Sequence, residues 1–176
     1  MNQSTKNKTS LSPYLDWTRE QLAITKTKVH KWKVWDSGDG DYEAFIESRR
    51  VVIPHPIDDW SFLVTLHEMG HVSTGDRLYS YLMEYNAEKW AIRRAKESYG
   101  VVCPEYEEDA RSYVKKHLIE NLVFSELSIE KVKPYVLEWL NETRSSIAKE
   151  IIKMNKQGLL DNFKIDKKYW QSVAKV

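Results

Sequence analysis

The sequence contains a single cysteine among 176 residues, Cys103. One cysteine cannot form a disulfide within the chain, and disulfides are the usual support of small secreted domains. The polar opening at residues 1–10 contains no apolar stretch of the kind found in secretory signal peptides. We therefore expect a cytoplasmic protein, and we expect Cys103 to be a small buried hydrophobic residue rather than a nucleophile.

Long hydrophobic runs are also missing. No segment approaches the roughly 18 consecutive apolar residues that a membrane-spanning helix needs, so no membrane partner is expected. No repeat, linker or low-complexity tract marks a second domain. With 41% hydrophobic and 30% charged residues, the composition is that of a folded globular chain. We expect a flexible N-terminal tail at residues 1–10 and one domain at residues 11–176.

Net charge is nearly absent, at +1, but it is distributed unevenly. Residues 1–33 carry 7 basic and 2 acidic groups, and residues 149–176 carry 7 and 3. The middle of the chain, residues 34–148, carries 13 basic and 21 acidic groups. This balance does not require a nucleic-acid partner, and we expect none. An acidic centre suits a cation, although solvated surface charge explains it equally well.

Cap and turn signals predict a mainly helical α+β protein. Ser12 followed by Pro13 is typical of a helix start, and Pro104 followed by acidic residues is another. We expect helices at residues 13–29, from residue 58 or 59 to about 72, at 77–99, at 104–124 and at 128–155, the last bent or restarted at Pro134, with a short docked segment at 169–170. We expect short antiparallel strands at residues 31–35, 42–48 and 50–53, with a turn at 37–40.

The segment His67-Glu68-Met69-Gly70-His71 carries the HExxH pattern on one of these helices. Histidines four residues apart lie on one helix face, about one turn apart, where both can bind one ion. Zn²⁺ accepts imidazole nitrogens and keeps an open position for water when the protein supplies three ligands. Glu68 is then placed to take a proton from that water during attack on a carbonyl. The alternative is two ordinary helix-surface histidines.

A catalytic zinc site needs a third protein ligand, because two histidines rarely suffice. The best candidate is Glu84, which shares a face of the next expected helix with Glu88. One of these carboxylates can bind the metal while the other hydrogen-bonds the far nitrogen of a ligand histidine. The alternative is an exposed, solvated acidic helix face.

The order of these residues resembles that of the gluzincin metallopeptidases, in which HExxH is followed on the next helix by a glutamate ligand and an acidic residue four positions on. The short gap from His71 to Glu84, and the run EYNAEKWA that begins at Glu84, look most like the compact ImmA/IrrE-type peptidases. The resemblance covers about residues 42–99, and no helix-turn-helix segment accompanies it.

This resemblance implies a zincin-like fold with one Zn²⁺ per chain. His67, His71 and Glu84 would be the ligands, Glu68 the general base, and Glu88 a partner of His67. The strand expected at residues 42–48 would border the cleft and pair with an extended peptide.

We therefore expect a zinc-dependent peptidase, more an endopeptidase than an exopeptidase, that acts on a protein or peptide substrate. Two alternatives stay open: an inactive or regulatory relative that binds proteins, and a zinc hydrolase of a non-peptide bond. Further polar side chains could contact substrate or stabilise an oxyanion, although each is more often a packed or surface residue. They are His117, Tyr79, Tyr81, Tyr85 and His55.

Overall fold

The computed structural model describes residues 12–35, 41–75, 79–125, 127–160 and 165–175. The tail expected at residues 1–10 and the turn expected at residues 37–40 lie outside these ranges. The described chain is mainly helical with a small sheet, which confirms the α+β prediction. None of its described helices combines the length and the apolarity that crossing a bilayer would take.

The chain forms two compact units. The first consists of Met1–Asp76 and Asn86–Tyr106, and the second of Arg77–Tyr85 and Glu107–Val176. Two helices, α3 (Ser80–Tyr99) and α4 (Pro104–Phe124), each begin in one unit and end in the other. The single domain expected at residues 11–176 therefore stays a prediction.

Helix α1 (Pro13–Thr25) opens the first unit. Proline in the first turn costs no hydrogen bond, because the first N–H groups of a helix have no partner within it. The helix ends at Lys26, whose φ of 52° places it in the left-handed region. The prediction that this helix continues to residue 29 is wrong, because the residues after Lys26 leave the helix and join the sheet.

The sheet contains β1 (Lys28–Lys33), β2 (Glu43–Phe45) and β3 (Arg50–Pro54), in the order β1-β3-β2. β2 pairs antiparallel with β3, but β1 pairs parallel with it, so the sheet is mixed rather than antiparallel as predicted. β3, whose apolar run Val51–Val52–Ile53 is at most 7% exposed, takes the central position, so β1 pairs with β3 and not with β2. A strand buried on both faces is best placed in the centre of a sheet, with a partner on each side.

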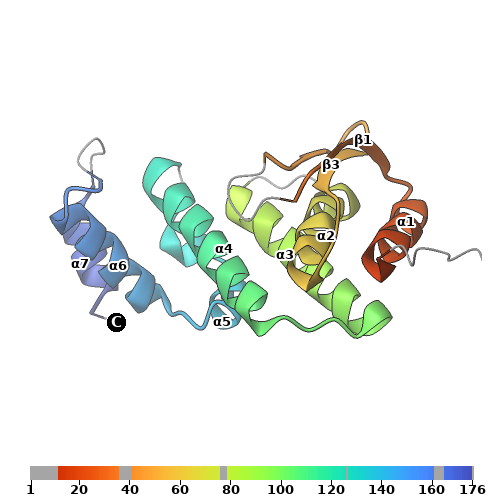
Figure 1. The fold of residues 1–176 in the computed structure, drawn as a ribbon. Coiled ribbons are helices and arrows are strands. Elements are labelled where there is room, and N and C mark those ends of the chain that lie inside the picture. The colour runs from red at the N-terminus through yellow and green to blue at the C-terminus, as the bar shows by residue number, and fades with distance from the viewer. Residues whose placement is uncertain (1–11, 36–40, 76–78, 126, 161–164, 176) are drawn as a thin grey trace, which may run out of the picture. The chain divides into compact units, whose positions relative to one another are not determined.

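Helix α2 (Asp59–Thr74) follows the sheet and carries the HExxH motif. Asp58 is its N-cap: the carboxylate accepts a hydrogen bond from the Ser61 backbone N–H at 2.7 Å, and Ser61 Oγ accepts one from the Asp58 N–H at 3.1 Å. This capping box satisfies N–H groups that a helix start otherwise leaves unpaired. Helix α1 and strands β2 and β3 all pack against α2 (Figure 1).

The second unit is helical. Beyond α4, whose predicted bounds of 104–124 are confirmed, the expected helix at residues 128–155 is divided into three. These are the 3₁₀ turn η1 (Ile129–Lys131), α5 (Pro134–Trp139) and α6 (Arg144–Lys156). Pro134 starts α5. After α5 the chain turns at Asn141, whose φ is 55°, and Thr143 then caps α6. Helix α7 (Lys167–Val173) docks through Trp170, which is 5% exposed in the core of this unit.

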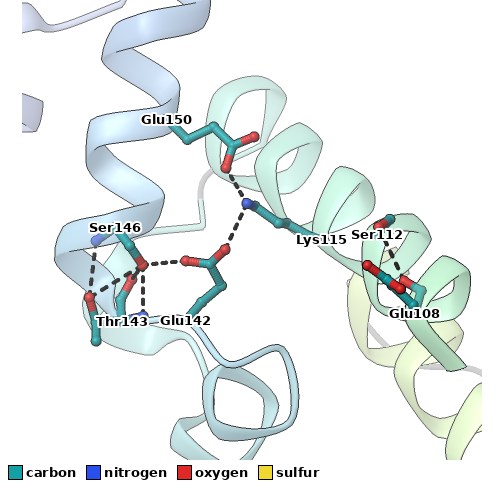
Figure 2. Close-up of polar contacts among 7 residues, drawn as sticks. All are labelled: Glu108, Ser112, Lys115, Glu142, Thr143, Ser146 and Glu150. Carbon is teal, nitrogen blue, oxygen red and sulfur yellow. Dashed lines mark hydrogen bonds and ion pairs between the residues drawn. The ribbon is translucent and has the colours of Figure 1, made fainter. Parts of the chain in front are cut away.

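A polar cluster ties α4 to the start of α6 within this unit (Figure 2). Lys115 Nζ donates to Glu142 Oε1 at 2.7 Å and also forms an ion pair with Glu150. Glu142 in turn accepts a hydrogen bond from Ser146, which belongs to the capping box of α6. The cluster therefore joins the cap of one helix to the side of another.

Candidate metal site

The two histidines of the motif lie one turn apart on α2 and face each other. His67 Nε2 and His71 Nε2 are 3.0 Å apart, with their rings edge-on at a centroid distance of 4.6 Å. Each residue is only 8% exposed. Ordinary surface histidines are solvated, so burial and convergence of the two rings exclude that alternative for this pair.

Gly70 brings α3 against this part of α2. A Cβ atom at this position would lie 2.7 Å from the carbonyl oxygen and 2.9 Å from the Cα of Ala87, both of them backbone atoms that cannot move aside. Any side chain at Gly70 would therefore push the two helices apart. Glycine at this position therefore allows the close packing of α2 on α3.

Close packing at Ala87 places the two acidic residues of α3 beside the histidines. The ligand-capable atoms of His67, His71 and Glu84 all lie within 4.8 Å of one another, a grouping that could hold one metal ion. Glu88, one turn further along the same helix, puts Oε1 3.0 Å from His67 Nδ1. Because Nδ1 of His67 faces Glu88, its other nitrogen is the one turned toward His71.

Tyr106, in the first turn of α4, extends this arrangement by one residue. Its hydroxyl donates to Glu88 Oε2 at 3.0 Å, and its ring lies edge-on to Trp60 at 5.4 Å. Glu88 and Tyr106 are each 5% exposed. No sequence signal pointed to Tyr106, because no local pattern distinguishes it from the other tyrosines among the 10 in the chain.

The donor set fits zinc. Two imidazole nitrogens and one carboxylate oxygen make a three-ligand set used by catalytic zinc sites, which leaves a fourth position open. Imidazole and carboxylate donors within 4.8 Å of one another match this requirement in kind and in spacing. Glu68 follows His67 on α2 and is also buried, at 8% exposure, so all three polar residues of the motif are withdrawn from bulk solvent.

Three tyrosines considered as substrate contacts lie at the start of α3 or just before it. Tyr81 is 1% exposed in the core of the second unit, and this burial raises the pKa of its phenol. So deeply buried a side chain packs rather than contacts substrate. Tyr79 lies beside it, with ring centroids 6.1 Å apart, and Tyr85 packs against Tyr135 and Trp139.

The two other histidines that were singled out have partners on their own elements or beside them. His55, directly after β3, is exposed and stacks on Trp32 at a centroid distance of 4.7 Å. His117 Nδ1 lies 3.4 Å from Glu120 Oε2 on α4, with its ring edge-on to Tyr113. Neither belongs to the group of side chains, among the described residues, that could hold a metal ion.

Cys103 is partly exposed, so the prediction that it is a buried residue is wrong. It lies in the short connection between α3 and α4, immediately before Pro104, and its Sγ is 3.8 Å from Glu105 Oε2. A connection between helices runs over the surface more often than through the core, which accounts for the exposure.

The chain matches no protein-family model, no curated protein and no solved structure.

Proposed function

We propose that this protein is a zinc-dependent peptidase whose metal is held by His67, His71 and Glu84. The observation that carries the proposal is the convergence of these three buried or half-buried side chains, with their ligand atoms within 4.8 Å. Burying several polar groups together costs free energy of folding unless they bind something or one another. When bound, zinc supplies a Lewis acid that polarises the substrate carbonyl and makes a water molecule more acidic.

Glu68 is the proton carrier in this proposal. Its carboxylate accepts a proton from the water whose oxygen bonds to the peptide carbonyl carbon. It then passes that proton to the amide nitrogen as the C–N bond breaks, so that the products are a free carboxyl group and an amine. Burial of Glu68 supports this role, since a carboxylate away from bulk water exchanges its proton with the bound reactants rather than with solvent.

Glu88 holds His67 in the orientation that a ligand needs. An ionised carboxylate at 3.0 Å from Nδ1 favours the proton on that nitrogen, which leaves the lone pair on Nε2. Metal-binding histidines commonly have such a carboxylate partner, whose loss weakens metal binding without removing a ligand.

The proposed substrate is an extended segment of a protein or peptide, cleaved internally. The support is strand β2, which pairs with β3 on one side and lies at the edge of the sheet among the described residues. It packs against α2, the helix that carries the motif. An edge strand beside such a site offers backbone groups to any extended chain, with little dependence on its side chains.

The proposal is tested with Glu68→Gln. Glutamine keeps the shape of the side chain but cannot accept the proton, so the variant should bind one zinc per chain and lose turnover by a factor of about 100 or more. Zinc is measured by elemental analysis, and cleavage by a proteome-wide search for new termini with wild type and variant side by side.

Each alternative predicts a different outcome. New termini produced equally by wild type and Glu68→Gln would eliminate the mechanism. Zinc in both proteins with no new termini from either would favour a binding protein or a hydrolase of a non-peptide bond. Purified protein without zinc, and unable to take it up, would remove the metal site itself.

A further inference from the structure

Both oxygens of the Glu88 carboxylate have a partner: a ligand histidine contacts one, and a tyrosine contacts the other. Oε1 lies 3.0 Å from His67 Nδ1, and Oε2 accepts the Tyr106 hydroxyl at 3.0 Å. We propose that Tyr106 is a positioning residue of the metal site, which sets the affinity for zinc through Glu88. The inference deepens the proposed function and rests on it.

Two partners fix a carboxylate where one does not. With a single contact at Oε1, the group can rotate about its last side-chain bond and carry that oxygen away from the histidine. A second contact, the hydrogen bond at Oε2, removes this freedom, so the Tyr106 hydroxyl keeps Oε1 aimed at His67. Since the orientation of His67 follows from that contact, the tyrosine acts on the ligand through an intermediate residue and touches neither metal nor substrate.

Neighbouring residues hold the Tyr106 side chain in place. It lies in the first turn of α4, which starts at Pro104, and its ring packs edge-on against Trp60 in the first turn of α2. The side chain is 5% exposed, so its hydroxyl is not shared with bulk solvent. A buried hydroxyl aimed at a buried carboxylate is pre-organised, and it holds the carboxylate without first having to be ordered.

The test is the zinc affinity of Tyr106→Phe, measured on the full chain by competition with a chromophoric chelator. Phenylalanine keeps the ring and its packing on Trp60 and removes only the hydroxyl. We expect zinc to bind about 10-fold more weakly, the lower end of the range for a lost partner of a ligand. Tyr113→Phe, an exposed tyrosine on the same helix, is the matched control and should bind zinc as wild type does.

A double-mutant cycle shows whether the effect passes through Glu88. In a Glu88→Ala background, Tyr106→Phe should change zinc affinity by less than about 2-fold, because the residue through which it acts is gone. The visible absorption spectrum of the cobalt-substituted protein gives a second reading. It should change in Tyr106→Phe and stay as wild type in Tyr113→Phe, because only the first alters the geometry of the ligand.

The possible outcomes distinguish failure of this inference from failure of the proposed function. Wild-type zinc affinity and cobalt spectrum in Tyr106→Phe would overturn the positioning role and leave the metal site standing. An equal 10-fold loss with and without Glu88 would also overturn it, since the tyrosine would then act by another route. A wild-type chain that binds no zinc would overturn the proposed function and this inference together.

Discussion

Glu84 and Glu88 lie one helical turn apart on α3, yet they meet the two histidines differently. Glu84 joins the group whose ligand atoms converge, while Glu88 faces the nitrogen of His67 that is turned away from His71. Side chains four residues apart share a helix face, so sequence spacing alone left their roles exchangeable. The contact of Glu88 with Nδ1 supports assigning Glu84 as ligand and Glu88 as the partner of a ligand.

This assignment predicts an order of zinc affinities. Glu88→Ala should weaken zinc binding about 10- to 100-fold, the usual effect of losing a partner of a ligand, and Glu84→Ala should weaken it more, because a metal–oxygen bond is lost. Affinities are measured by chelator competition. Glu97→Ala, an exposed acidic residue on the same helix, serves as control and should behave as wild type. A larger loss in Glu88→Ala than in Glu84→Ala would exchange the two roles.

Among the elements, the short strand β2 bears most directly on how substrate is held. It covers only Glu43–Phe45, because Ile46 starts the turn that leads into β3 through Arg49, whose φ is 51°. The longer strand expected at residues 42–48 is therefore corrected. Within an antiparallel ladder, successive residues direct their N–H groups to opposite sides. Of Glu43 and Ala44, one N–H faces β3 and the other faces the edge.

Proline substituted at each of these two positions in turn should affect sheet stability in one variant and substrate binding in the other. The variant that loses the N–H toward β3 should be destabilised, since a ladder hydrogen bond is removed. The other should remain folded and zinc-loaded but lose about 1 to 3 kcal/mol in kcat/KM, the value of one or two hydrogen bonds. Thermal unfolding and cleavage of a verified substrate give the two readings. Wild-type cleavage by both variants would exclude strand pairing along β2.

The cluster around Lys115 makes the second unit sensitive to pH. Burial by itself raises the pKa of Glu142, but hydrogen bonds from Lys115 and Ser146 outweigh it and lower the pKa below the usual 4.5. Burial likewise lowers the pKa of Lys115, and its contacts with Glu142 and Glu150 raise it above 10.5. The contribution of Glu142 to stability is therefore lost as pH falls through its folded pKa, and that of Lys115 as pH rises through its own.

Lys115→Met should consequently destabilise the protein most at neutral pH. We expect a loss of about 1 to 2 kcal/mol at pH 7, because Glu142 keeps its burial but loses its charged partner. At acid pH, below the folded pKa of Glu142, the carboxylate is protonated and the difference from wild type should shrink. Urea unfolding at both pH values measures it, with Lys116→Met, an exposed neighbour, as control. The same loss at both pH values would contradict the ionic origin.

For the whole molecule, zinc would act as a link between α2, which supplies two ligands, and α3, which supplies the third. A ligand that binds only the folded state stabilises it by about 2.7 kcal/mol at 100 times its dissociation constant. For a chain of this size that corresponds to a rise in Tm of roughly 5 to 10 °C.

Removal of metal by a chelator should therefore lower the Tm, and added zinc should restore it. Scanning calorimetry of the full chain measures the shift, and it also shows whether the two compact units unfold together or in separate transitions. His67→Ala is the control, since its Tm should not respond to zinc. An unchanged Tm in the wild-type chain at saturating zinc would contradict a site that joins these helices.

Features that depend on neighbouring residues were determined by the sequence itself. Pro104 and the acidic residues after it predicted the start of α4, and Asp58 or Asp59 predicted the start of α2, because caps and first turns are local interactions. The spacing of His67 and His71 places both on one helix face, whatever the tertiary fold.

Features that depend on distant residues were decided only by the tertiary structure. The central position of β3, the approach of Ala87 to the motif helix and the contact of Tyr106 with Glu88 each join segments that no local pattern relates. Burial has the same origin: whether Tyr81 packs in a core or faces a substrate depends on which helices cover it. Local propensity acts within a turn or a strand, whereas these contacts follow from how whole elements pack to remove apolar surface from water.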